Sequence, residues 1–297
     1  MSRQIRLALN LQVGGRHDAA WKRLPADQAR TIAYDLDHYT EIAKIAERGR
    51  LDALFLADGG HGSLSEDASR RPWHGLEPIV LLAALAGRTE RIGLVATLHA
   101  IHGHPFRVAR SIASLDLVSK GRAGWNIITS QGESTLEALG TNEVLDSETR
   151  YRKAEEFTAI VAGLWDSFPR SAVVGGASRD VFVDRSRTQP LDHKGEFYSS
   201  KAVLPIPGGH DGRPVLFQAG ASDRSHAFGA AWADGLFTSQ RTKAHGQQFR
   251  SHIHALARAA RRDPDKIGVA SRSSPRRASV ASPSGSCSST TSPVGSG

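Results

Sequence analysis

The sequence predicts an α/β protein of the (β/α)8 TIM-barrel type. Apolar segments typical of buried strands alternate with amphipathic helical segments along most of the 297 residues, a pattern that predicts a parallel sheet covered by helices. No Gly-x-Gly-x-x-Gly motif follows the first strand, and polar residues end several different strands, which favours a barrel. An open, doubly wound sheet is the alternative.

Seven segments have the composition of strands. Residues 53–58 are nearly continuous in apolar side chains, as expected for a strand that is covered on both faces. The other six segments are 5–10, 92–97, 122–128, 214–220, 235–239 and 266–269. The pattern stops within the last of these, so we expect a barrel that is truncated after about six to seven strands.

Helices are predicted between these strands from apolar residues at three- and four-residue spacing. The first has its apolar face at Leu36, Tyr39, Ala43 and Ala46. Further helices are predicted over 77–86, around 108–115, from Ser147 as N-cap, after Ser222 as N-cap, and around 249–256.

The regular alternation breaks between residues 166 and 213, where Gly, Pro and short alternating runs occur. We interpret this segment as an insertion before strand five, within a barrel domain over 1–269. The tail 270–297 is rich in Ser, Pro, Gly and Arg, and it buries too little apolar surface to offset its ordering entropy. It is either a disordered tail or the product of a reading frame lost near Gly268. The second interpretation is favoured because a strand is abandoned in mid-element.

Composition limits the partners and the location. The net charge of +8 raises nucleic acid as a partner, but no acidic residue follows Asp265. Much of the charge therefore belongs to the tail, and we expect no nucleic-acid partner. The sequence has no apolar run long enough for a bilayer, no signal-peptide pattern and a single cysteine, Cys287. These features predict a cytoplasmic protein without membrane contact or an internal disulfide.

Polar residues stand where several predicted strands end. Asp58 ends the second, Thr97 the third, and Asn126 with Thr129 and Ser130 the fourth. The carboxyl ends of parallel strands carry the active site in β/α barrels, so these residues are candidates for ligand contact. The alternatives are a turn or helix-cap role for Asp58 and simple packing for Thr97.

The segment 219–225 predicts an anion site. A strand runs into Gly220 and then into Ser222, which caps a helix with Arg224 in its first turn. Free backbone N–H groups and the positive end of a helix suit a phosphate. Tyr151 could donate a hydrogen bond to the same phosphate. The alternatives are an ordinary capped helix and a core tyrosine, but Arg224 favours the anion site, because an arginine suits a helix N-terminus less well than an acid unless an anion is near.

Three histidines, His99, His102 and His104, follow the third strand. No acidic residue or cysteine accompanies them and their spacing matches no zinc motif, so we expect no metal site. A histidine that donates a proton or a hydrogen bond to a ligand is the favoured interpretation.

Several of these segments together resemble the bacterial-luciferase-like flavin monooxygenases. The most specific is Gly-Arg-Ala-Gly-Trp-Asn at 121–126, followed by Thr and Ser at 129–130. The others lie at 54–58, 114–116, 150–151 and 218–222. More narrowly, these segments resemble the branch that holds nitrilotriacetate monooxygenase component A, dibenzothiophene-sulfone monooxygenase and long-chain alkane monooxygenase.

The resemblance implies a monooxygenase that receives reduced FMN from a separate NAD(P)H:flavin reductase and uses O2 to oxygenate a small organic substrate. It implies that the flavin ring and ribityl chain contact Asp58, Thr97, Asn126 and Ser130. It implies that the phosphate contacts Tyr151, Ala221, Ser222 and Arg224. The candidate catalytic residues are His99, His104 and Asn126. The alternatives are a deazaflavin-dependent oxidoreductase of the same fold and a non-catalytic truncated product. A homo-oligomer paired through helices is possible for such barrels.

Overall fold

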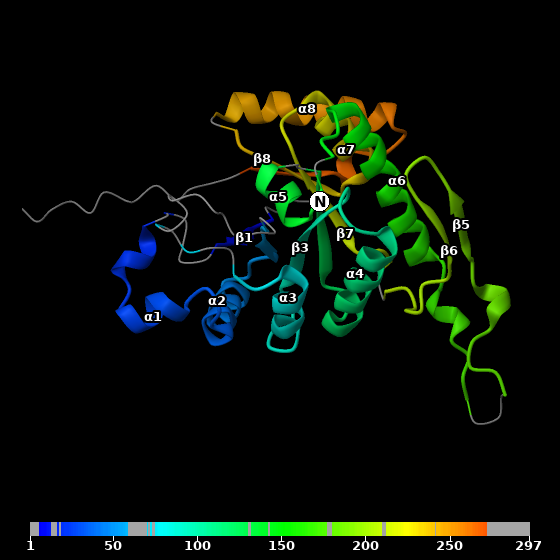
Figure 1. Cartoon of the computed structure of the whole chain (residues 1–297), viewed down its shortest axis with the longest axis horizontal. Helices are drawn as coiled ribbons and strands as arrows, with labels where there is room; N and C mark the ends of the chain where they lie inside the picture. Colours follow the sequence, from blue (N-terminus) through cyan, green and yellow to red (C-terminus); the bar gives the residue numbers. More distant parts are fainter. Residues whose placement is uncertain are drawn as a thin grey trace, which may run out of the picture.

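The main feature of the fold is a parallel seven-stranded sheet in the order β1-β2-β3-β4-β7-β8-β9 (Figure 1). The computed structural model describes residues 6–12, 17, 19–58, 70, 72, 75–129, 132–141, 143–176, 180–209, 212–240 and 242–271. The strands are β1 (Ala8–Leu11), β2 (Ala53–Leu56), β3 (Gly93–His99), β4 (Ala123–Ile128), β7 (Val215–Ala219), β8 (Gly235–Thr238) and β9 (Gly268–Ser271). Each strand overlaps one of the seven predicted segments. The sequential order excludes a doubly wound sheet, in which the strand order reverses.

Aromatic contacts show that the sheet is curled. Phe55 of β2 lies 5.8 Å from Phe217 of β7 and 6.2 Å from Phe237 of β8, measured between ring centroids. Two strands separate β2 from β7 in the sheet order, so these rings meet across a concave face. Gly235 makes room for them, because a Cβ there would lie 2.6 Å from the Phe217 ring. The sheet is thus a TIM-barrel-like half-barrel, as predicted.

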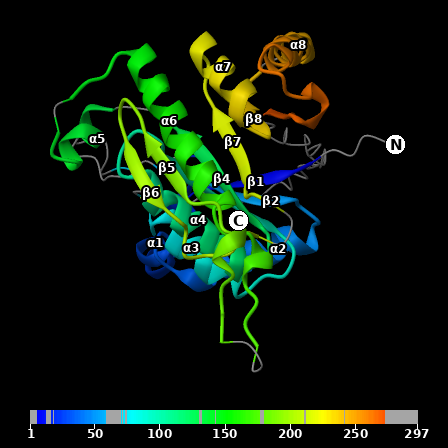
Figure 2. The same cartoon turned by 90° about the vertical axis from the view of Figure 1, so that its right-hand side faces the viewer.

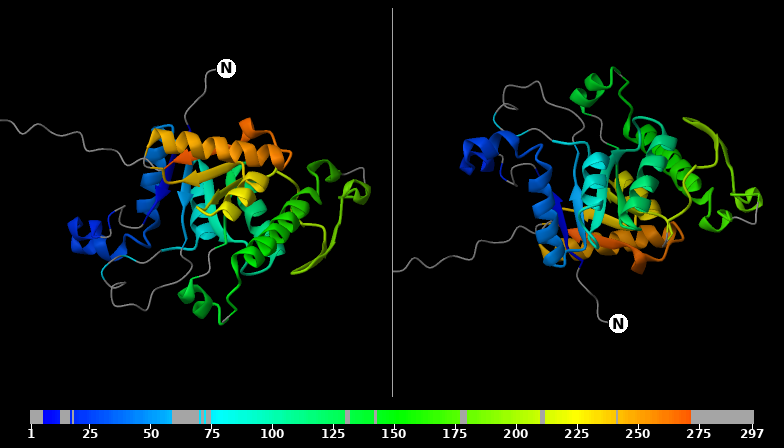
Figure 3. Two further views of the ribbon diagram at one scale, coloured as in Figure 1. Left: turned by 90° about the horizontal axis from the view of Figure 1, so that it is seen from above. Right: turned by 90° about the horizontal axis from the view of Figure 1, so that it is seen from below.

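Helices cover the convex face of this half-barrel (Figure 3). They are α2 (Leu36–Arg48), α3 (Pro78–Ala86), α4 (Pro105–Ser119), α6 (Ser147–Asp166), α7 (Asp223–Trp232) and α8 (Lys243–Ala259). Each packs against the next one in this order. The core lies between the helices and the sheet, where Leu54, Leu94 and Trp125 are fully buried. Residues with the opposite strand parity therefore face the concave side.

The predicted N-cap of α6 is wrong by one residue. Asp146, not Ser147, caps the helix, and its carboxylate accepts hydrogen bonds from Thr149 N at 3.0 Å and from Thr149 Oγ1 at 2.6 Å. A negatively charged acceptor at the N-terminus of a helix also interacts favourably with the helix dipole. The short helices α1 (Ala26–Thr31) and α5 (Glu133–Ala138) were not predicted from the sequence.

Between α6 and β7, the strands β5 (Leu191–Lys194) and β6 (Ser199–Ala202) form a separate antiparallel pair. This hairpin lies beside α6 (Figure 2). Glu156 of α6 holds it, since its carboxylate accepts from Tyr198 N at 2.8 Å and Phe197 N at 3.0 Å and lies 3.0 Å from His193 Nε2. Burial would raise the pKa of Glu156, but these hydrogen bonds outweigh burial and lower it.

Ala270 and Ser271, which were assigned to the tail from the sequence, belong to β9. Residues 272–297 lie outside the described part of the chain. No helix in the described ranges is both long enough and apolar enough to cross a membrane.

Candidate active site

The structure places the predicted site residues along one edge of the parallel sheet, the edge formed by the carboxyl ends of its strands. Asp58 follows β2, Thr97 and His99 lie at the end of β3, Asn126 lies in β4 and Ser222 follows β7. Because these strands are parallel and neighbours in the sheet, their carboxyl ends form a single edge. Ser130, which was predicted to contact the flavin, lies outside the described residues.

Thr97 and Asn126 form a buried pair on the concave face. They are register partners on adjacent strands, and Asn126 Nδ2 donates a hydrogen bond of 3.0 Å to Thr97 Oγ1. Their exposed fractions are 3% and 4%. Asn126 is also the register partner of Phe217, whose ring lies on the concave face. The pair therefore points into the half-barrel.

The side-chain carbonyl oxygen of Asn126, Oδ1, takes no part in the hydrogen bond to Thr97. Asn126 Oδ1 is buried and accepts no hydrogen bond from any residue that the structure describes. A buried polar atom without a partner costs about 1–3 kcal/mol, so native proteins rarely leave one without a reason. This carbonyl is a ready acceptor for an N–H or O–H group of a bound ligand.

Asn10 of β1 provides a second acceptor of this kind. Its register partner is Phe55, which places it on the concave face, and its Oδ1 is also buried without a hydrogen-bond partner among the described residues. Sequence reasoning missed Asn10 because it was assigned only to the predicted first strand. The available signal was a polar side chain inside an otherwise apolar strand.

The histidines separate into two environments. His99 follows Thr97 by two residues in β3, which gives it the same face, and its ring lies 5.1 Å from that of His102. His104 instead caps α4, where its Nδ1 accepts a hydrogen bond of 3.2 Å from Phe106 N. The His104 ring lies 6.4 Å from that of Tyr198. His99 therefore shares the concave face with Asn126, whereas His104 lies at a helix terminus.

The predicted phosphate residues come together where α6 and α7 begin. Ser222 caps α7, as predicted, by accepting a hydrogen bond of 3.2 Å from Ser225 N. Ser222 and the preceding Ala221 are exposed. Tyr151, in the first turns of α6, is buried, and its ring lies 5.7 Å from Phe228 of α7. A helix N-terminus thus lies open next to a tyrosine.

Arg224 has partners that the sequence did not indicate. Its guanidinium lies 5.6 Å from the centre of the Tyr151 ring and forms ion pairs with Glu148 at 3.0 Å and Glu155 at 2.8 Å. The hydrogen bond that Arg224 donates to Glu155 is the main reason that the pKa of Arg224 is raised. These two carboxylates account for an arginine at a helix N-terminus, so Arg224 by itself does not indicate a phosphate.

Gln218 and Gly220 support the loop that carries Ser222, and sequence reasoning assigned neither a role. Gln218 is 2% exposed, and its Nε2 donates to Ser225 Oγ at 3.1 Å and to Ala219 O at 3.0 Å. A Cβ on Gly220 would lie 1.9 Å from Ser225 Oγ. The loop therefore packs against the first turn of α7 without room for a side chain at position 220.

Most of the Gly-Arg-Ala-Gly-Trp-Asn motif is structural. Trp125 is fully buried on the helix side and donates from Nε1 to Leu98 O at 3.1 Å. The Arg122 guanidinium donates to the carbonyl oxygens of Ala86, Thr89, Ile92 and Ser119 at 2.6–3.1 Å. Only Asn126 presents a polar side chain to the concave face, where the motif meets the candidate site.

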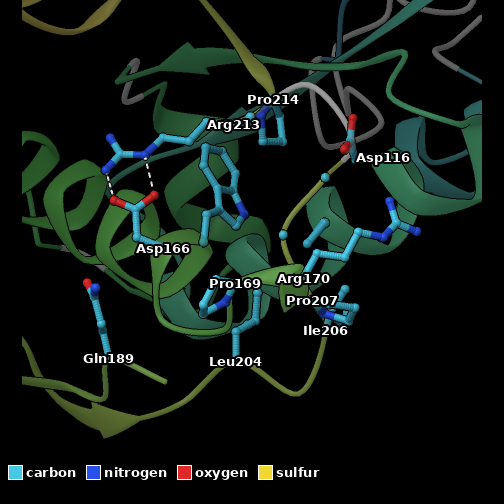
Figure 4. A pocket seen from close by; sticks show the side chains of 15 residues that line it. Asp116, Asp166, Pro169, Arg170, Gln189, Leu204, Ile206, Pro207, Arg213 and Pro214 are labelled. Carbon is cyan, nitrogen blue, oxygen red and sulfur yellow. Dashed lines mark hydrogen bonds and ion pairs between the residues drawn. The ribbon is translucent and has the colours of Figure 1, made fainter. Parts of the chain in front are cut away.

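A cavity of about 440 Å³ lies at the opposite edge of the sheet (Figure 4). Its lining includes Asp116 at the end of α4 and Pro214, which precedes β7. Asp166 and Arg213 form an ion pair on its wall, with Arg213 Nε 2.8 Å from Asp166 Oδ1. The amino ends of the strands serve stability rather than catalysis in β/α barrels, so this cavity is separate from the candidate active site.

Known proteins resemble this chain over most of its length. Residues 18–278 match the family model described as luciferase-like monooxygenase. The chain is 40% identical over 269 residues to N-acetyl-S-(2-succino)cysteine monooxygenase of Bacillus subtilis (strain 168), covering 90% of this chain and 60% of that protein. It is 37% identical over 262 residues to nitrilotriacetate monooxygenase component A of Aminobacter aminovorans, covering 85% and 57%.

A solved structure of riboflavin lyase, with modified FMN and the substrate riboflavin, superposes with a TM-score of 0.79 at 29% identity. That match covers 91% of this chain and 62% of the lyase. The chain thus spans about 60% of the length of the curated relatives it matches. With the family model matched over most of its residues, the chain belongs to the luciferase-like monooxygenase family.

Proposed function

We propose that this chain carries the flavin site of a two-component monooxygenase. In this proposal, a separate NAD(P)H:flavin reductase supplies reduced FMN, and O2 is used to oxygenate a small organic substrate. The observation that carries the proposal is Asn126 Oδ1 at the carboxyl edge of the sheet, which is buried and has no hydrogen-bond partner among the described residues. The designation "component A" of the Aminobacter relative supports the separate reductase.

The residues of this edge fit the chemical groups of FMN. The isoalloxazine ring carries an N–H donor and the ribityl chain carries hydroxyl donors, either of which Asn126 Oδ1 and Asn10 Oδ1 can accept. The phosphate is an anion, which suits the N-terminus of α7, where Ser222 is exposed and the Tyr151 ring lies under Arg224. In this arrangement Arg224 stays paired with its two glutamates and holds the Tyr151 ring in position.

The division of labour follows from these contacts. Bound FMN would supply the redox chemistry toward O2, while the protein supplies orientation and exclusion of water. Asn126 and Thr97 fix the polar edge of the ring. His99, on the same face of β3, is placed to hydrogen-bond the substrate or hold a proton beside the ring. The modified FMN in the riboflavin lyase structure supports the choice of FMN.

Anaerobic titration of the protein with reduced FMN tests the proposal. We expect saturable binding, which the pair Ser222→Ala and Tyr151→Phe weakens about 10- to 100-fold, as expected for lost hydrogen bonds to a charged group. Ser114→Ala, which removes an exposed hydroxyl on α4, is the matched control and should leave the affinity unchanged. Riboflavin, which lacks the phosphate, should bind the variants as it binds the wild type.

Two results would overturn the proposal. One is the absence of saturable reduced-FMN binding by a sample that circular dichroism shows to be folded. The other is tighter binding of a reduced deazaflavin than of reduced FMN in a parallel titration, which would favour the deazaflavin-dependent alternative.

A further inference from the structure

Two helices bring together a second cluster of histidines outside the candidate active site. Asp223 and His226 are three residues apart on α7, so they share one helix face, and His252 approaches them from α8. One potential ligand atom from each of these residues lies within 4.8 Å of those of the other two. We call these three residues the α7–α8 site.

The packing of α8 on α7 fixes this arrangement. Phe249 and Ile253 are buried between α8 and the rest of the fold. The His226 ring contacts Phe249, with a centroid distance of 5.1 Å and an edge-to-face angle of 86°. The rings of His226 and His252 lie 5.4 Å apart. Two imidazoles therefore lie next to each other, edge to face, because the apolar residues beside them anchor the helices.

The surroundings suit a cation. The α7–α8 site lines a cavity of about 350 Å³, whose other polar lining is Gln240, His245 and Gln248. Among the described residues that line it there is no lysine or arginine to repel a metal ion. His226 Nδ1 is shielded from solvent, and the Gly220 backbone lies within hydrogen-bond reach of the His226 ring. A backbone partner on one ring nitrogen is the usual way in which a histidine ligand is oriented toward a metal ion.

We propose that the α7–α8 site binds a divalent transition-metal ion, with Zn²⁺ as the expected ion. Two imidazoles and one carboxylate are ligands that zinc and its neighbours in the first transition row prefer, whereas Mg²⁺ and Ca²⁺ prefer sets of oxygen ligands. Three protein ligands leave at least one coordination position for water.

The geometry needs only side-chain rotation. Bonds of about 2.0–2.2 Å to zinc require ligand atoms to lie within about 4 Å of one another, slightly closer than the 4.8 Å limit in the structure. Asp223 and His252 are exposed, so their side chains can turn inward without repacking the core. A bound ion would join the start of α7, next to Ser222, to α8.

Titration of the untagged, metal-free protein with Zn²⁺ tests this site without any flavin. The wild type should bind with a stoichiometry of one ion per chain at the α7–α8 site. His226→Ala, His252→Ala and Asp223→Asn should each raise the Kd at least about tenfold, because each removes one of three ligands. His254→Ala is the matched control, since His254 lies on the same helix and its Nε2 accepts a hydrogen bond from Arg250.

The visible spectrum of bound Co²⁺ provides a second readout. Nitrogen and oxygen ligands give d–d bands without a thiolate charge-transfer band, so the spectrum should be unchanged in Cys287→Ser. Absence of saturable Zn²⁺ binding, wild-type affinity in all three ligand variants, or a thiolate band lost in Cys287→Ser would each overturn the proposal. Because these metal-binding measurements need no FMN, their outcome does not depend on whether the proposed monooxygenase function is correct.

Discussion

The Arg122 guanidinium donates two hydrogen bonds to Thr89. Its Nη1 donates to the Thr89 hydroxyl at 2.9 Å, and its Nη2 donates to the Thr89 carbonyl oxygen at 3.1 Å. Thr89 follows α3, whereas Arg122 immediately precedes β4. The contact therefore joins two βα units through a charged group that is partly buried. Burial lowers the pKa of Arg122, with Glu47 acting in the opposite direction.

Removing this guanidinium should destabilise the fold. Arg122→Ala leaves several carbonyl oxygens without their charged donor, so we expect a loss of about 3 kcal/mol or more in the free energy of unfolding. Arg122→Lys keeps the charge without the planar fork and should give an intermediate loss. Urea unfolding measures both. Arg110→Ala, at an exposed position of α4, should change stability by less than about 0.5 kcal/mol, and an equal loss there would contradict the prediction.

The Thr97–Asn126 pair should respond asymmetrically to substitution. Thr97→Val leaves the Asn126 Nδ2 without its acceptor, in addition to an Oδ1 that has no partner among the described residues, and should cost about 1–3 kcal/mol. The double variant Thr97→Val with Asn126→Leu removes both partners of the hydrogen bond while keeping similar volumes, so the stability should change by less than about 1 kcal/mol. If the proposed function holds, the double variant nevertheless loses reduced-FMN affinity. Unfolding curves and flavin titrations of the two variants provide the comparison, and equal stability losses would count against this account.

Two glycine-to-alanine substitutions should have opposite effects on the stability of the fold. At Gly220, the new Cβ would lie 1.9 Å from Ser225 Oγ and 2.7 Å from its Cβ, so Gly220→Ala should destabilise by about 1–3 kcal/mol. At Gly246, in the first turn of α8, a Cβ meets nothing within 4 Å. Gly246→Ala should therefore stabilise by about 0.5–1 kcal/mol through helix propensity. Thermal melts of both proteins test the pair, and a melting point for Gly220→Ala at or above that of the wild type would refute the close packing.

The contact of Glu156 with the β5–β6 hairpin predicts a pH dependence. The folded pKa of Glu156 is lowered from its ordinary value of 4.5, so its contribution is fully present above that value and is lost as the pH falls through the folded pKa. Glu156→Gln should unfold at lower urea concentration than the wild type at pH 7. The difference between the two proteins should shrink as the pH is lowered below 4.5. A difference that stays constant with pH would show that the carboxylate charge does not contribute.

The sheet, most helices and the edge of the sheet at which the candidate site residues lie were predictable from sequence. Buried parallel strands are short apolar runs and covering helices have a three- and four-residue period, so both are visible within windows of a few residues. The edge followed from the same reasoning, because a polar residue that ends an apolar run lies at the carboxyl end of a strand. Asn126 and Ser222 were found in this way.

Pairings between distant segments were not predictable in the same way. The β5–β6 hairpin has neither strong alternation nor a two-residue turn signal. Its place beside α6 depends on Glu156, which is far from it in sequence. Asn10 was overlooked because its importance comes from its register with Phe55 and the curl of the sheet.

The order of secondary-structure elements and the chemistry of the strand ends were determined by the sequence alone, since both depend on neighbouring residues in the chain. The tertiary structure decided which charged groups and which possible metal ligands lie close together. Arg224 pairs with Glu148 and Glu155, and Asp223 and His226 lie close to His252, only because buried side chains set how α6, α7 and α8 pack. Those contacts join residues that are far apart in the chain, and no short window of sequence contains both partners.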